Sequence, residues 1–121
     1  MFREKFKREV TVNPAINTKG MNFTPLDKYI GKKVRIYGFF LTDTKFGKQV
    51  VAVTTKALVN MPKRCVADFE SLNENEVNAV MNGDMVLTNI KPFTSKQGKT
   101  VVFDYDDIEY HPDMLKDNPK V

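Results

Sequence analysis

Hydrophobic and polar residues alternate most clearly in the stretch "KKVRIYGFFLTD", which begins at Lys32. Because successive side chains of a strand point to opposite faces, this spacing predicts a β-strand. One face, with Val34, Ile36 and Phe40, is uniformly apolar and is expected in the core. The other face also carries charged residues, so we expect it to meet water. A mid-strand glycine, Gly38, predicts a bulge or a sharp bend.

Strand-like runs recur along the rest of the chain, at 48–55, 64–69, 84–93 and 100–110. Pro62 breaks the connection before the run at 64–69, and Pro92 is expected to end the run at 84–93. The period becomes helical once, over 72–81, where Ser71 and Glu74 fit a capping box and Gly83 fits a helix stop.

This order of a hairpin, a third strand, a helix and a second hairpin predicts a mainly β fold. We expect an OB-fold, a five-stranded Greek-key barrel with one helix between strands three and four. The predicted division is a basic N-terminal arm over 1–30, the barrel over 31–110 and a C-terminal tail over 111–121.

The pattern Lys-x-Gly-Lys-x-Val-Val occurs twice, starting at Lys45 and at Lys96. In each copy the glycine suits the positive φ that short hairpin loops require. In an OB-fold the loop between strands one and two and the loop between strands four and five flank the ligand-binding face. The repeat is therefore predicted to place two basic loops on either side of one groove.

The charge distribution suggests an anionic binding partner. The formal net charge is +4, and residues 1–33 hold eight Lys and Arg against three Asp and Glu. Such a basic segment suggests nucleic acid, with a solvated terminus as the alternative. The fifth strand runs against this trend, because Asp104, Asp106, Asp107 and Glu109 form an acidic edge that phosphates should avoid.

Composition also narrows the classes of protein to which this chain could belong. One cysteine, Cys65, cannot form an internal disulfide, and we expect a reduced, cytoplasmic setting. The charged start "MFREKFKREV" is not expected to be a secretory signal, and no apolar run approaches the roughly 20 residues of a membrane span. One Cys and one His suggest neither a zinc site nor a Cys-His pair. We therefore expect no enzymatic activity, no bound metal and no cofactor.

The layout from Val34 to Tyr110, with its two Lys-Gly-Lys turns and basic start, resembles OB-fold single-stranded-DNA-binding proteins. It looks most like the compact versions carried by bacteriophages, including those of lactococcal phages. The resemblance implies DNA replication or recombination in the host cytoplasm, with replication or recombination proteins as partners. The chain departs from many bacterial relatives in ending "KDNPKV" rather than in an acidic, phenylalanine-terminated tail, and it has no tryptophan.

Base stacking would therefore fall to Phe and Tyr, and phosphate contact to Lys and Arg. Packing beneath the N-terminal segment or in a dimer is the alternative for the aromatic residues. The candidate DNA-binding residues are Arg35, Tyr37, Phe39, Lys45, Phe46, Lys48, Lys63, Arg64, Lys96 and Lys99.

Three functions remain open from the sequence. The first is sequence-tolerant binding of single-stranded DNA, and the second is binding of RNA, which the same charges and aromatic rings would serve. The third is a structural or assembly module without nucleic acid. The exposed edges expected of a small barrel also predict a homodimer or a higher homo-oligomer.

Overall fold

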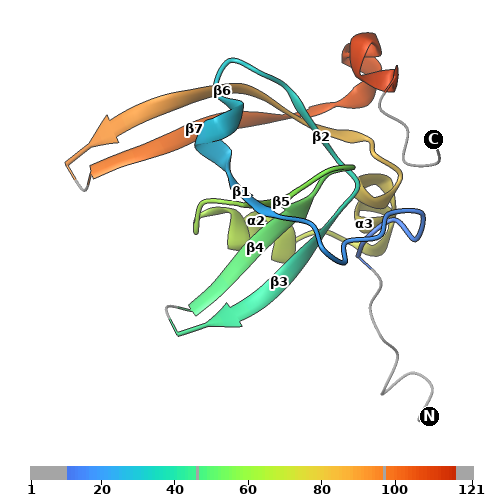
Figure 1. Cartoon of the computed structure of the whole chain (residues 1–121), viewed down its shortest axis with the longest axis horizontal. Helices are drawn as coiled ribbons and strands as arrows, with labels where there is room; N and C mark the ends of the chain where they lie inside the picture. The colour runs from blue at the N-terminus through green and yellow to red at the C-terminus, as the bar shows by residue number, and fades with distance from the viewer. Residues whose placement is uncertain (1–10, 46, 97, 117–121) are drawn as a thin grey trace.

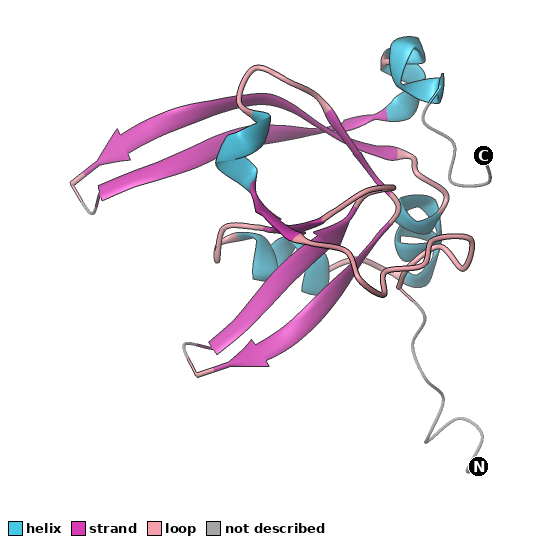
Figure 2. Ribbon diagram, in the orientation of Figure 1, coloured by secondary structure: helices cyan, strands magenta, loops and turns pink. Residues whose placement is uncertain are grey.

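The computed structural model describes residues 11–45, 47–96 and 98–116, and these fold into two sheets with helices beside them (Figures 1 and 2). The four-stranded sheet has the order β1 (Phe23–Pro25), β5 (Leu58–Asn60), β4 (Gly47–Val53), β3 (Gly38–Thr44). The three-stranded sheet has the order β2 (Val34–Ile36), β6 (Met85–Ser95), β7 (Gly98–Asp107). The expected β-rich fold is confirmed, whereas the described strands do not close into one barrel.

The helices lie between and after these strands. The α-helices α2 (Cys65–Glu70) and α3 (Glu74–Met81) join β5 to β6. Short 3-10 helices flank the sheets: η1 (Leu26–Tyr29) follows β1, and η2 (Ile108–Tyr110) and η3 (Pro112–Lys116) follow β7.

The strand predicted from Val34 onwards is divided between the two sheets. β2 pairs antiparallel with β6, whereas β3 pairs antiparallel with β4, and only Tyr37 separates β2 from β3. The bend predicted at Gly38 is confirmed: this residue has φ 157°, and a β-carbon on it would lie 2.4 Å from Cα of Val12. Glycine is therefore required where the N-terminal segment crosses the bend.

The bend changes which side chains enter the core. Ile36 and Phe39 are both buried in the main core, where the ring of Phe39 packs against that of Phe69. Phe40, expected in the core, is half-buried against a second cluster formed by Val51, Val53 and Leu58. The simple alternation predicted across Gly38 is wrong, because the bend shifts its phase.

The strand predicted at 64–69 is wrong, because residues 65–70 form the helix α2. Its buried residues, Cys65 and Phe69, are four apart, which is helical spacing. The strand that follows β4 along the chain is instead β5, which pairs with both β4 and β1. It lies in the stretch that was expected to be a connection.

The helix predicted over 72–81 is confirmed as α3, but its cap lies two residues later than expected. Asn73 accepts a hydrogen bond from the Glu76 backbone, and the Glu76 side chain accepts one from the Asn73 backbone. Ser71 instead donates to the Asp68 carbonyl at the end of α2.

β6 continues past Pro92 to Ser95, so the predicted end at Pro92 is wrong. Beyond Leu87 the described β2 no longer pairs with β6, so this side of β6 can accept a residue without an N–H.

Candidate nucleic-acid interface

The two copies of the repeated phrase form two matching hairpin turns. β3–β4 and β6–β7 project from the same side of the molecule, with their turns at the free ends (Figure 1). Gly47 and Gly98 open the returning strands with φ of 105° and 121°. The Thr44 hydroxyl donates to the Gly47 carbonyl over 2.7 Å, and the Ser95 hydroxyl donates to the Gly98 carbonyl over 3.3 Å. The repeat thus includes a hydroxyl residue before its first lysine, which lies outside the pattern Lys-x-Gly-Lys-x-Val-Val.

The two residues just before α2 contact both hairpins. Lys63 Nζ lies 3.7 Å from the point that a β-carbon on Gly47 would occupy, so this side chain reaches the first turn. Arg64 donates to the Val101 carbonyl over 2.9 Å and places its guanidinium 5.6 Å from the centre of the Phe103 ring. Lys63 therefore points to one hairpin and Arg64 to the other.

Six of the predicted cations lie on the two hairpins and in the turn before α2, and all of them are exposed. We call them the hairpin cations: Lys45, Lys48, Lys63, Arg64, Lys96 and Lys99. Lys48 has an acidic neighbour, since its Nζ lies 3.5 Å from Glu70 Oε2 at the end of α2. Both side chains of this pair are well exposed, so the pair contributes little stability and Lys48 remains accessible to an anion.

Tyr37 and Phe39 do not belong to this surface. The expectation that they face solvent is wrong, because they are only 1% and 2% exposed. Tyr37 also sits against Gly83, whose missing β-carbon would lie 2.5 Å from the tyrosine ring. These two rings are packing residues in this fold, and stacking on them would require the core to open.

Arg35 is likewise engaged inside the fold. Its Nε donates to the Gly83 carbonyl over 2.6 Å, and its Nη1 donates to the Met114 carbonyl over 3.2 Å. Its guanidinium also lies 4.9 Å from the centre of the Tyr37 ring. Arg35 therefore fastens the end of α3 and the C-terminal segment to β2, away from the hairpin cations.

Other aromatic residues are placed better for stacking. Phe93 on β6 is 51% exposed and lies opposite Thr100 in the second hairpin. The sequence marked this residue only by its position after Pro92. Phe46, predicted to bind DNA from the first turn, lies outside the described residues, and that assignment stays a prediction.

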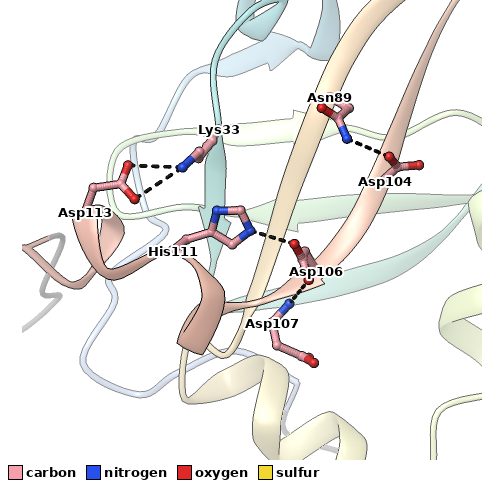
Figure 3. Close-up of polar contacts among 7 residues, drawn as sticks. All are labelled: Lys33, Asn89, Asp104, Asp106, Asp107, His111 and Asp113. Carbon is pink, nitrogen blue, oxygen red and sulfur yellow. Dashed lines mark hydrogen bonds and ion pairs between the residues drawn. The ribbon is translucent and has the colours of Figure 1, made fainter.

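The acidic edge of β7 lies toward its end and makes contacts of its own (Figure 3). Asp104 accepts a hydrogen bond from Asn89, and Asp106 Oδ2 lies 2.7 Å from His111 Nε2. Farther along, Lys33 Nζ lies 3.2 Å from Asp113 Oδ1. The hydrogen bond from His111 is the main reason that the pKa of Asp106 lies below its ordinary value of 3.8.

The described residues include no group of three His, Cys, Asp or Glu side chains placed to hold a metal ion. None of the helices in the described ranges is long and apolar enough to cross a membrane. A scan against protein-family models, a search of curated proteins and a search of solved structures each found no match to this chain.

Proposed function

We propose that this protein binds single-stranded DNA without strong sequence preference, as an OB-fold protein of DNA replication or recombination. The observation that carries the proposal is the placement of the hairpin cations on two hairpins that project from the same side of the molecule. Two matched basic turns project from one side of the molecule. Lys63 and Arg64 lie just before α2, where Lys63 reaches the first hairpin and Arg64 bonds to the second.

The course of the chain supports the OB-fold part of the proposal. A bent strand segment, β2–β3, pairs with β6 before Gly38 and with β4 after it. Helices separate the third strand of the meander, β5, from the second hairpin. In an OB-fold the first and second hairpins flank the ligand face. In this chain the hairpin cations lie on its two hairpins and in the turn before α2.

The chemistry fits a flexible polyanion better than a duplex. α3 carries Glu74 and Glu76 in its first turn, so it is poorly suited to a DNA groove. The cations are instead distributed over two hairpins and the turn before α2, where they can follow a phosphate backbone. Phe93 offers an exposed ring to a base.

Charge reversal of one hairpin tests the proposal. Lys96→Glu with Lys99→Glu should weaken binding to fluorescent oligo-dT by on the order of tenfold or more at 0.1 M salt, because two phosphate contacts are lost. The measurement is fluorescence anisotropy, with circular dichroism to verify folding.

The matched control is Lys19→Glu with Lys56→Glu, which makes the same charge change at exposed lysines outside the hairpin cations. Lys56 follows β4 at the end opposite the first turn. Equal losses in the two variants would reduce the effect to net charge and contradict the proposed interface. A separate experiment, competition between DNA and RNA oligomers, distinguishes DNA binding from RNA binding.

A further inference from the structure

Two adjoining hollows lie between the helices and the bases of β6 and β7, at the end of these strands opposite the hairpin turn. Their volumes are about 250 and 230 Å³, and they share Leu72, Met85 and Tyr105 as lining residues. Phe69 and Val80 add further apolar surface. Each hollow is smaller than the roughly 300–1,000 Å³ site of a drug-sized ligand, and suits a single large side chain better.

Carboxylates surround this apolar floor. Glu76, Asp84 and Asp107 line the first hollow together with Asp106, and Asp68 lines the second. No lysine or arginine belongs to the lining of either hollow in the part of the chain that the structure describes. We call the two hollows together the acidic groove. An apolar floor with an acidic rim fits a segment that combines aromatic and basic side chains.

The N-terminus of this chain has that composition. Residues 1–10, "MFREKFKREV", contain Phe2 and Phe6 among four basic and two acidic residues. The proposed nucleic-acid interface uses neither this segment nor the acidic groove.

The described chain begins close to the groove. The Asn13 side chain donates to the Met81 carbonyl at the end of α3 over 2.8 Å, and Met81 directly follows Val80 of the groove lining. Phe6 precedes Thr11 by five residues, a reach of up to about 18 Å at roughly 3.3–3.6 Å per extended residue.

We propose that residues 1–10 of the same chain dock in the acidic groove. A phenylalanine ring occupies the apolar floor, and the neighbouring lysines and arginines face the carboxylates of the rim. Docking pairs the basic side chains of this segment with the carboxylates of the rim and covers part of the acidic edge that phosphates avoid. This internal contact is separate from nucleic-acid binding and is tested without DNA.

Photocrosslinking of the full chain tests this directly. With p-benzoylphenylalanine in place of Phe6, irradiation should link position 6 to peptides containing residues 68–85 or 105–107, as identified by mass spectrometry. The linked product should be monomeric, and its yield should not depend on protein concentration. Absence of links to these peptides, or links that join two chains only, would overturn the proposal.

A second readout tests the charge pairing. Asp84→Asn with Asp107→Asn should lower the yield of this crosslink by about threefold or more, since exposed charge pairs are individually weak but act together here. The matched control, Asp27→Asn with Asp43→Asn, removes the same charge outside the groove and should leave the yield unchanged. An equal yield in the groove variant would also overturn the proposal.

Discussion

Phe39 and Phe69 pack with ring centroids 4.8 Å apart in the main core, so removing one ring should leave a cavity. We expect Phe39→Ala to lower the free energy of unfolding by about 3–5 kcal/mol, measured by urea denaturation. Leu41→Ala is the control on the same strand, because Leu41 is exposed, and a surface substitution should stay within about 0.5 kcal/mol. Unchanged stability in Phe39→Ala would contradict the burial of Phe39 and would support the solvent-facing position that strand alternation predicts.

Gly83 and Gly98 allow the cost of backbone strain to be compared with the cost of a steric clash when a β-carbon is added. Both have positive φ, but a β-carbon on Gly83 would collide with the buried Tyr37 ring, whereas one on Gly98 would meet open space. Gly98→Ala should therefore cost roughly 1–2 kcal/mol of backbone strain, and Gly83→Ala should cost about 1–3 kcal/mol more. Thermal unfolding of the two variants gives the comparison, and equal melting temperatures would contradict the close packing of Tyr37 against Gly83.

Asp106 gives the C-terminal segment a dependence on pH. Its folded-state pKa is lowered, chiefly by the hydrogen bond from His111, so the ionised carboxylate stabilises the fold above its ordinary pKa of 3.8. That stabilisation is lost as the pH falls through the lower, folded-state pKa. Asp106→Asn should therefore lower the melting temperature near neutral pH and have little effect near pH 2. A difference that is the same at both pH values would mean that the charge of Asp106 plays no part.

Among the elements, α2 holds an acidic residue against the proposed interface. Glu70 pairs with Lys48 across 3.5 Å, so it competes with phosphate for this lysine. Glu70→Gln should tighten oligo-dT binding by up to about fivefold, in line with the roughly 0.2–1 kcal/mol of an exposed ion pair. Anisotropy titrations provide the measurement, and Glu74→Gln on α3 is the matched control. Weaker binding in Glu70→Gln would place the bound strand elsewhere.

The elements also differ in how far the sequence could predict them. Both hairpins were predictable because Gly47 and Gly98 lie inside local turn patterns that need no distant contact. α2 was not, because a run as short as "RCVADF" satisfies strand and helix patterns alike. Its spacing of Cys65, Val66 and Phe69 after Pro62 was the signal that favoured a helix.

At the scale of the whole molecule, the candidate site was predictable only in part. The lysines of the repeat were predictable because hairpin tips are exposed in almost any fold. Tyr37 and Phe39 were not, because their burial depends on the crossing of the chain between two sheets at Gly38 and on the N-terminal segment that packs there. Arg35 could not be placed either, since its partners Gly83 and Met114 are distant in sequence.

The central claim is that the hairpin cations bind one single strand through its phosphates. The measurement that tests it most directly is a salt series of anisotropy titrations on oligo-dT and on a duplex of equal length. With the six hairpin cations engaged, log K should fall against log salt with a slope on the order of −4, at about −0.7 per phosphate. Affinity for the single strand should exceed that for the duplex throughout the series. Equal affinity for the duplex, or binding that does not change with salt, would contradict the claim and favour a protein assembly module.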